Sequence, residues 1–301
     1  MTETHFLAIE TGGTKLIARL ERGDGTIIGT MRRPTSGPDA ALADIVGFVE
    51  STLGARKTIA GVGMAAFGPL VLDPLSVDHG RLLATPKPGW SGANLRAMLA
   101  DALGTTVTVD SDVNAAARAE QQLGAGQGFR SVAYITVGTG IGGGLAIDGT
   151  TLSGHLHPEI GHLRLIRAAG DTAPSTCPFH PDCAEGLAAG PAIAARLGPG
   201  RVLVDDPALQ QLVAHYLGQL AASITLAWSP DRIVWGGGVM STAGLMAALI
   251  PAMRQSLHGY DQGWRSNAPD YCVAASLADA GLEGAMLMAR GQVAGGPVAG
   301  L

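Results

Sequence analysis

The chain has 301 residues, of which 47% are hydrophobic and 15% charged, and its formal net charge is −5. So long and apolar a chain can bury a large core, and we expect that core to be divided between two domains. The mild negative charge and the lack of a Lys/Arg block exclude the electrostatic footprint of a protein that binds nucleic acid or an anionic membrane.

Targeting signals and cysteines indicate the compartment. The amino terminus, MTETHFLAIE, reaches apolar sequence at once and lacks the charged region and cleavage site of a signal peptide. Three cysteines, Cys177, Cys183 and Cys272, are too few for a disulfide scaffold. The uncharged run 131–147 is interrupted by glycine and is shorter than the ~20 apolar residues of a membrane-spanning helix. We therefore expect a cytoplasmic protein.

The first elements form a hairpin with a glycine tip. A short apolar strand over 6–9 runs into Thr11-Gly12-Gly13-Thr14, and a second strand follows over 16–20. Backbone N–H groups at such a tip can converge on an anion, and threonine hydroxyls add donors. An ordinary hairpin turn is the alternative. The pattern is not a P-loop, because Lys15 directly follows Gly-Gly-Thr without the required spacing.

Strands and helices then alternate, which is typical of an α/β fold. Apolar periodicity predicts a helix over 45–53, a strand over 59–67, a helix over 95–103, a strand over 106–109 and a helix over 114–123. Asp110, Asp112 and Asn114 lie where this last strand ends and the helix begins. Asp110 and Asn114 are equally well explained as helix N-caps. Asp112, at the carboxyl end of a strand, can accept a hydroxyl proton while the oxygen attacks phosphorus.

The second half opens on a copy of the first hairpin. The stretch YITVGTGIGGGLAIDG, residues 134–149, places a glycine-rich turn between β-forming flanks. Glycine in a strand or helix costs roughly 0.5–1 kcal/mol relative to alanine, so this density requires a reason. A matched pair of threonine-containing tips, one near the start of each half, favours a duplicated architecture with two phosphate-binding turns over two ordinary turns.

The segment between His155 and Cys183 carries the densest ligand chemistry. Cys177, His180 and Cys183 have C-x₂-H-x₂-C spacing, and His162 precedes them by a loop. Zinc takes four such ligands in a tetrahedron, and clustered cysteines in a reducing compartment are more often metal ligands than a disulfide. These four residues predict a structural zinc site, with two ordinary thiols in a Pro-rich loop as the alternative. His155 and His157 compete for ligand roles.

Carboxylates flank this segment, and the α/β pattern then continues. Glu159 and Glu185 suit the hydroxyl pairs of a polyhydroxylated ligand, or they are simply solvated on a surface loop. A long core-facing helix over 209–224 is followed by a strand over 232–235 and the turn Gly236-Gly237-Gly238. A helix over 243–257, a strand over 271–275 and a helix over 282–290 complete the pattern.

Over nearly its whole length the chain resembles the ROK family (repressors, open reading frames and sugar kinases), and within it the bacterial fructokinases. The resemblance rests on segments that follow in the family's order and spacing: ETGGTK (10–15), FGP (67–69), TPKPGW (85–90), DSDVN (110–114), TVGTGIGGG (136–144), HPEIGH (157–162), CPFHPDC (177–183) and EGLAAGP (185–191). Glu10 stands where much of the family has Asp, but the fructokinase-like branch also tends to carry Glu.

The resemblance implies an actin-like (ribonuclease H-like) α/β fold, duplicated in two domains with an interdomain cleft. We expect one domain over 1–113 with the C-terminal helix at about 282–301, and a second over 114–281 that carries the zinc loop 155–185. It also implies ATP-dependent phosphorylation of a hexose at its terminal hydroxyl, foremost fructose to fructose 6-phosphate, with Mg²⁺ accompanying ATP. Family members are often homodimers.

The resemblance also assigns roles to residues. Asp112 is the expected catalytic base, and the expected sugar-binding residues are Glu159, His162, Glu185, Asn114, Gly68 and Pro69. The nucleotide is expected to contact two glycine turns and a third glycine run: Gly12, Gly13, Thr14, Lys15, Thr136, Gly138, Thr139, Gly140, Gly236, Gly237 and Gly238. The zinc ligands are expected to be His162, Cys177, His180 and Cys183, and Glu10 is expected to reach Mg²⁺ through water.

Three other functions stay open at this point. One is a glucose or mannose kinase of the same family, although TPKPGW and the C-x₂-H-x₂-C site favour fructokinase. Another is a sugar-responsive repressor, which would carry an amino-terminal helix-turn-helix. Only residues 1–5 precede the first expected strand, which leaves no room for that motif. The third is a non-catalytic, zinc-stabilised sugar-binding protein, against which Asp112 and both glycine hairpins argue.

Overall fold

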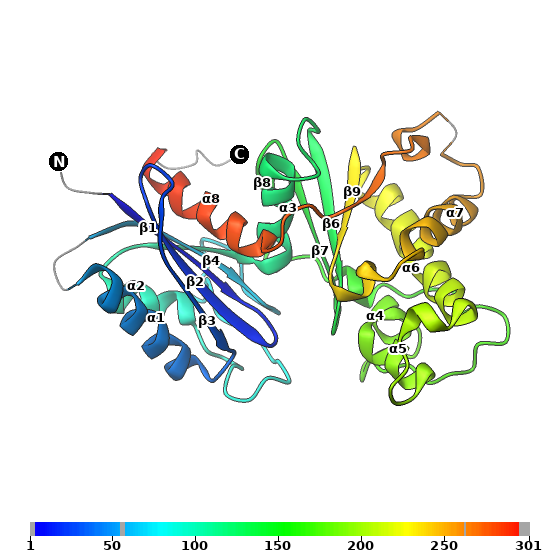
Figure 1. The fold of residues 1–301 in the computed structure, drawn as a ribbon, viewed down its shortest axis with the longest axis horizontal. Helices are drawn as coiled ribbons and strands as arrows, with labels where there is room; N and C mark the ends of the chain where they lie inside the picture. Colours follow the sequence, from blue (N-terminus) through cyan, green and yellow to red (C-terminus); the bar gives the residue numbers. More distant parts are fainter. Residues whose placement is uncertain (1–3, 55–57, 262, 295–301) are drawn as a thin grey trace. The chain divides into compact units, whose positions relative to one another are not determined.

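The computed structural model describes residues 4–54, 58–261 and 263–294 (Figure 1). The chain forms two compact units. Unit 1 comprises Met1–Ala119, Leu152–His157 and Asp279–Leu301, and unit 2 comprises Glu120–Thr151 and Pro158–Ala278. The predicted domain boundaries, 113/114 and 281/282, remain a prediction, and part of the predicted C-terminal helix, 295–301, lies outside the described residues.

Unit 1 is built on a five-stranded sheet with the order β3-β2-β1-β4-β5. Strands β1, β2 and β3 form an antiparallel meander, and β4 and β5 join parallel to β1. Their bounds are His5–Thr11, Lys15–Arg22, Ile27–Pro34, Ile59–Ala66 and Val107–Ser111. The antiparallel hairpin between β1 and β2 places the first glycine tip at the edge of the sheet where β4 and β5 also end.

Both faces of this sheet are buried, because successive side chains of a strand point to opposite faces. Leu7 and Ile9 belong to the core under α1 (Pro38–Leu53) and α2 (Leu95–Leu103). Phe6 and Ala8 belong to a second cluster with α8 (Ala280–Ala294), which lies on the other face (Figure 1). A strand covered on both sides reads as a continuous apolar run, as FLAI does.

Unit 2 repeats the design. Its sheet has the order β10-β9-β6-β7-β8, which read from β8 is the same sequence of antiparallel and parallel neighbours as in unit 1. The bounds of β6 to β10 are Ser131–Val137, Ile141–Ile147, Thr150–Thr151, Arg232–Gly236 and Cys272–Ala274. Helices α6 (Pro207–Trp228) and α7 (Leu245–Leu257) contribute Tyr216, Leu217 and Leu249 to its core. The duplication expected from the two hairpins is therefore present in the strand order.

Helix α8 makes close backbone contacts with β4 and with the helix α3 (Asp112–Leu123) in unit 1. A Cβ on Gly63 of β4 would lie 1.9 Å from the carbonyl oxygen of Ala285, and one on Gly284 would lie 2.0 Å from the carbonyl oxygen of Ala115. Only glycine allows this approach, because the atoms that a side chain would meet are backbone. Arg19 of β2 also holds the helix by donating to both carboxylate oxygens of Glu283, at 2.7 and 2.8 Å.

Replacing Gly63 with alanine is expected to lower the free energy of unfolding by about 1–3 kcal/mol or more, because the added methyl group must displace helix backbone. Gly47→Ala is the matched control. Gly47 lies in α1 with nothing within 4 Å of an added Cβ, so alanine there should stabilise by about 0.5–1 kcal/mol. Urea unfolding of the two variants measures both changes in the free energy of unfolding. Equal stability of Gly63→Ala and wild type would contradict the packing described here.

The structure agrees with most of the predicted elements and corrects others. The helix expected over 95–103 has the same bounds as α2. The strand expected over 106–109 extends through Asp110 and Ser111, and α3 (Asp112–Leu123) begins two residues before the predicted start at 114, so Asp110 belongs to the strand. Strands β3 and β8 and helices α4 (Ala184–Ala188) and α5 (Gly190–Leu197) were not predicted. Among the described helices, none combines the length and hydropathy needed to cross a membrane.

Candidate active site

The first glycine turn joins β1 to β2 in unit 1. The Gly12 N–H donates to the carbonyl of Lys15 at 2.8 Å, and the Thr35 hydroxyl donates to the carbonyl of Gly12 at 2.7 Å. A Cβ on Gly13 would meet nothing within 4 Å. Within the described part of the chain, the N–H groups of Gly13 and Thr14 donate to no acceptor. The turn therefore offers two open donors to an anion.

Charged side chains surround this turn. The Lys15 ammonium lies 3.4 Å from Oε1 of Glu10 and 3.4 Å from Oδ1 of Asp279. Arg32 donates to Oδ2 of the same Asp279 carboxylate. Burial disfavours the charged form of Asp279, but the hydrogen bond from Arg32 and the charge of Lys15 outweigh it and lower the pKa of Asp279. Glu10 is buried, and its Oε2 has no hydrogen-bond partner among the described residues. A buried carboxylate oxygen without a partner among the described residues, beside a turn with two open N–H donors, fits the water shell of a bound Mg²⁺.

Unit 2 carries the second glycine turn, between β6 and β7. The Gly138 N–H donates to the carbonyl of Gly140 at 2.9 Å, and the carbonyl of Gly138 accepts from the N–H of Gly190 at 2.7 Å. The Ile141 N–H donates to Oε2 of Glu185 at 3.0 Å. As in the first turn, two successive N–H groups, here those of Thr139 and Gly140, donate to no acceptor within the described part of the chain.

Left-handed backbone does not explain the glycines of the two turns. Gly12, Gly13, Gly138 and Gly140 are not among the glycines with positive φ. A Cβ on Gly140 would instead lie 2.6 Å from Oε2 of Glu185, and one on Gly138 would meet nothing within 4 Å. One glycine makes room for a protein carboxylate and the other leaves the turn's surface open. In this turn, glycine therefore leaves room for the carboxylate at position 140 and keeps the surface open at position 138.

The third glycine run, Gly236–Gly238, begins at the last residue of β9 in the same unit. Gly237 has a positive φ of 88°, and a Cβ there would lie 2.4 Å from the carbonyl oxygen of Val137. Gly236 lies against the Tyr134 ring, which a Cβ would meet at 2.8 Å. This run therefore lies beside the strand that leads into the second turn, and here the left-handed conformation itself selects glycine.

Asp112 begins α3 at the carboxyl end of β5 in unit 1. Its Oδ1 accepts from the N–H of Val113 at 2.9 Å, and the side chain is half-buried. Its neighbours are more deeply fixed, because Oδ1 of Asp110 accepts from the N–H of Ser111 at 2.7 Å and from Nδ2 of Asn114 at 2.8 Å. Asn114 is fully buried and also donates to the carbonyl of Leu152 at 3.1 Å. Asp110 and Asn114 thus brace the junction that carries the half-buried Asp112.

Gly68 and Pro69 follow β4 and are joined by a cis peptide bond. A Cβ on Gly68 would lie 2.1 Å from Nε2 of His157, so the His157 ring lies against this glycine. Leu72 N–H donates to the carbonyl of His155 at 3.0 Å. The segment 152–157 is therefore fixed to unit 1. Among the described residues, the ligand cluster comprises His162, Cys177, His180 and Cys183 and does not include His155 or His157.

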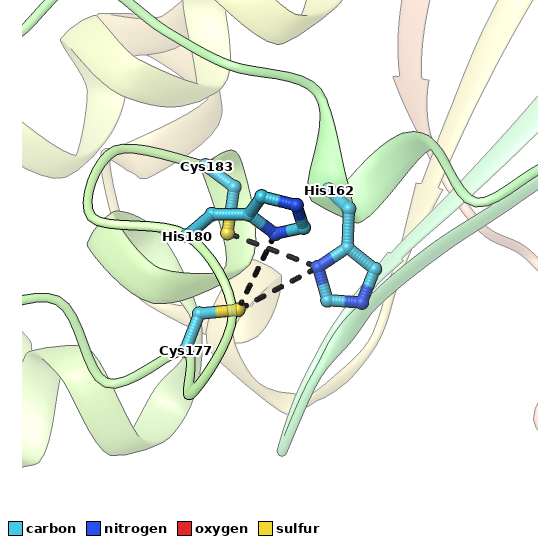
Figure 2. Close-up of side chains that lie close together, drawn as sticks. All are labelled: His162, Cys177, His180 and Cys183. Carbon is cyan, nitrogen blue, oxygen red and sulfur yellow. Dashed lines mark hydrogen bonds between the residues drawn. The ribbon is translucent and has the colours of Figure 1, made fainter. Parts of the chain in front are cut away.

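Four side chains of unit 2 form a ligand cluster (Figure 2). One ligand atom from each of His162, Cys177, His180 and Cys183 lies within 4.8 Å of the others. Nδ1 of His162 lies 3.7 Å from Sγ of Cys177 and 3.8 Å from Sγ of Cys183, and Nδ1 of His180 lies 3.7 Å from Sγ of Cys177. The ligand atoms of a tetrahedral zinc site are about 3.3–3.8 Å apart, so the donor set and its spacing fit that metal.

The loops around this cluster are independently held. Arg164 pairs with Asp182 next to Cys183, and the Ser175 hydroxyl donates to the carbonyl of His180 at 2.7 Å. Cys183 is the N-cap of α4, and its Sγ accepts from the N–H of Gly186 at 3.4 Å. Burial and the neighbouring Cys177 raise the pKa of Cys183 to about 11 in the absence of a cation. A metal must therefore displace a proton from this thiol, and its affinity should rise with pH.

The candidate residues fall in both units. Asp112, Asn114, Gly68, Pro69 and the first turn belong to unit 1, and the second turn, Gly236–Gly238 and the ligand cluster belong to unit 2. Glu159 is exposed just before the short 3-10 helix Ile160–His162, and Glu185 is half-buried in α4. Sequence reasoning missed Thr35, Asp279 and Gly190, which hold the two turns. Gly190 lies within the EGLAAGP segment, but nothing in the sequence pattern marks the other two.

Comparison with known proteins gives consistent results. A sequence model of the ROK family matches residues 6–292. The chain is 37% identical over 287 residues to a protein named fructokinase from Zymomonas mobilis, covering 93% of this chain and 95% of that one. It is 32% identical to a fructokinase from Pediococcus pentosaceus, covering 94% of this chain and 96% of the relative.

Two solved structures resemble the fold closely. The ROK hexokinase from Thermus thermophilus has a TM-score of 0.76 and 30% identity, covering 96% of this chain and 99% of that one. A ROK family glucokinase from Streptomyces griseus, in complex with glucose and AMPPNP, has a TM-score of 0.69 and 27% identity, covering 95% and 99%. With the repeated strand order, these likenesses confirm the predicted duplicated α/β fold of actin-like type.

Proposed function

The chain belongs to the ROK family, and we propose that it is an ATP-dependent kinase that converts fructose to fructose 6-phosphate. This proposal is supported mainly by the pair of equivalent hairpin turns, each with two backbone N–H groups that have no acceptor among the described residues. A half-buried carboxylate, that of Asp112, lies at the end of β5. Fructokinases from several bacteria that are 30–37% identical over most of the chain support the substrate.

Asp112 is the proposed catalytic base. Its carboxylate accepts the proton of the C6 hydroxyl as that oxygen forms a bond to the γ-phosphorus and the bond to the β,γ-bridging oxygen breaks, releasing ADP. Asp110 and Asn114 hold the strand-to-helix junction, so the carboxylate is presented in a fixed place. The two glycine turns donate backbone N–H groups to the phosphates, with Lys15 beside the first, and Gly236–Gly238 line the adenosine side.

Mg²⁺ bound with ATP would neutralise charge between the β- and γ-phosphates. Glu10 is the residue that would hold its water shell, because its Oε2 is buried without a partner among the described residues. Glutamate is one methylene longer than aspartate, and its carboxylate should still reach that water shell.

The sugar-binding proposal centres on Glu159, His162 and Glu185, whose polar groups suit vicinal hydroxyls. Gly68 and Pro69 contribute backbone, and Asn114 contributes through the segment 152–157 whose Leu152 carbonyl it binds. His162 can serve both a metal and a sugar. Its Nδ1 faces the two cysteine sulfurs while Nε2 points away from them (Figure 2). A metal on Nδ1 would fix the proton on Nε2, where it can be donated to a hydroxyl.

We further propose that the cluster of His162, Cys177, His180 and Cys183 binds one structural Zn²⁺. Four protein ligands leave no open position on the metal. The metal would therefore hold the loop 155–185, which carries the proposed sugar-binding residues, and would not act on the substrate. The protein is proposed to be a cytoplasmic homodimer, in keeping with its family.

A glucose or mannose kinase is the second candidate, because the chain is also 27% identical to a glucokinase from Halalkalibacterium halodurans. A coupled ADP-release assay over fructose, glucose and mannose separates the two by kcat/KM. We expect fructose to exceed the other hexoses by at least about tenfold, which corresponds to about 1.4 kcal/mol of transition-state binding. A larger kcat/KM for glucose or mannose would replace fructose as the substrate, and no turnover of any hexose would favour a non-catalytic sugar-binding protein.

A further inference from the structure

Glu185 makes a contact that its proposed role as a sugar ligand does not explain. Its Oε2 accepts from the N–H of Ile141, at 3.0 Å and across 44 residues of sequence. The contact depends on glycine at position 140, because a Cβ there would lie 2.6 Å from the same carboxylate oxygen. Any larger residue at position 140 would displace the carboxylate or the turn.

This hydrogen bond is one of the restraints on the turn 138–141. Among the described residues, Glu185 is the one side chain that hydrogen-bonds to the backbone of this turn. The Gly138 carbonyl accepts from the N–H of Gly190 at 2.7 Å, and Gly161 packs against the Ile141 carbonyl. Ile141 is also paired with Val137 in the hairpin of β6 and β7, and its side chain is buried in the core of unit 2. The N–H group held by Glu185 directly follows the unpaired N–H groups of Thr139 and Gly140. Its position therefore sets the direction in which those two donors point.

The same glutamate is tied to the ligand cluster. It is the second residue of α4, which has only five residues, and the helix begins at Cys183 as its N-cap. Sγ of Cys183 accepts from the N–H of Gly186, on the far side of Glu185. So short a helix has little stability of its own, and its first turn is fixed where Cys183 is fixed. A continuous set of contacts leads from the cluster through Glu185 to the turn.

We propose that Glu185 is a positioning residue for the second glycine turn, and that it links the metal centre to phosphate binding. The carboxylate orients the Thr139 and Gly140 donors through Ile141. This inference rests on the proposed function, which makes a nucleotide phosphate the ligand of the turn. It gives Glu185 a part in nucleotide affinity in addition to its proposed contact with the sugar.

Two effects of the carboxylate oppose each other. Its hydrogen bond orders the turn, whereas its negative charge repels the phosphate that the turn receives. Gln keeps an acceptor oxygen and removes the charge, and alanine removes both. If ordering dominates, as we propose, Glu185→Ala binds nucleotide more weakly than wild type and Glu185→Gln binds it at least as well. If repulsion dominates, both variants bind more tightly.

The test is calorimetric titration of the sugar-free protein with Mg²⁺ and ADP, which avoids the sugar contact. We expect Kd to rise about fivefold to tenfold in Glu185→Ala and to stay within about twofold of wild type in Glu185→Gln. The matched control is Glu159→Ala, which should leave the Kd for ADP unchanged while lowering fructose affinity. Amide hydrogen exchange of the peptide containing Ile141 gives a readout independent of nucleotide, and it should be about tenfold faster in Glu185→Ala and after metal removal.

The outcomes are distinct. An unchanged or tighter Kd in Glu185→Ala, or unchanged exchange at Ile141, overturns the inference and leaves the proposed kinase intact. Wild-type protein that binds no ADP overturns the proposed function, and the inference with it. Rescue by Glu185→Gln of both exchange and ADP affinity, with fructose affinity still lowered, supports the positioning role.

Discussion

Replacing Asp112 with asparagine is expected to lower kcat for fructose phosphorylation by about 10²–10⁴-fold, because the amide cannot accept the hydroxyl proton. The variant should fold normally, since an amide oxygen can still accept from the N–H of Val113, which donates to Oδ1 of Asp112 at 2.9 Å. Fructose and ADP affinities should change little. Steady-state kinetics on one preparation measure the loss of kcat. Thermal unfolding and elemental analysis of the same preparation check that folding and metal content are unchanged.

Asp101→Asn is the matched control for this loss. Asp101 lies exposed on α2 in the same unit, so its substitution should alter neither kcat nor stability beyond about 0.5 kcal/mol. An Asp112→Asn enzyme with near-normal turnover would remove Asp112 as the base. The proton acceptor would then have to be sought among the other carboxylates proposed for the sugar site.

Removing the metal is expected to produce the largest loss of stability. If the site holds zinc at a free concentration about 1,000 times its Kd, linkage contributes about 4 kcal/mol to folding, and chelation should remove it. The loop that carries His162 and α4 should loosen, so fructose affinity should fall as well. Melting curves with and without chelator measure the loss of stability. Readdition of Zn²⁺ shows how much of that loss is reversible.

Cysteine substitutions localise the effect. Cys177→Ser should abolish stoichiometric zinc, whereas Cys272→Ser should retain it, because Cys272 is buried in β10 and its Sγ lies 3.8 Å from Sδ of Met253. Both variants alter a buried thiol, so a packing loss alone would appear in both. One zinc per chain in Cys177→Ser, or none in wild type purified without chelator, would refute the metal site.

The sequence was most informative where local patterns determine the structure. Helix α2 was predicted with its observed bounds from its apolar periodicity. The structure shows that local residues fix those bounds, since Asn94 caps the first turn and Gly104 ends the helix in a left-handed conformation. The two glycine hairpins and the strands next to them were identified from alternating β-formers and glycine. Their equivalence predicted the duplicated strand order that the two sheets share.

Elements without a local pattern were missed. Strand β3 (IIGTMRRP) lies at the edge of its sheet, and Met31 is its one buried residue, so no alternation of apolar side chains marks it. Helix α5 begins with Gly190-Pro191, which reads as a turn although proline is favoured in the first turn of a helix. Helix α4 is too short to show periodicity.

In the candidate site, too, residues with local spacing could be predicted from the sequence, and contacts between distant residues could not. The spacing of Cys177, His180 and Cys183 is local and could be recognised directly in the sequence. Including His162 required only the assumption that the chain between 162 and 177 forms a loop that brings it back to the cysteines. The contact of Glu185 with Ile141 and the pairing of Lys15 with Asp279 join residues 44 and 264 positions apart. Such contacts depend on tertiary packing, which no short motif encodes.

The most direct test of the proposed activity is phosphorus NMR of the product formed from fructose, ATP and Mg²⁺. We predict one phosphate ester on the C6 hydroxyl, formed in step with ADP and absent with the Asp112→Asn enzyme. Release of inorganic phosphate alone, esterification at C1, or no consumption of ATP would contradict a kinase in which Asp112 deprotonates the terminal hydroxyl of a bound hexose.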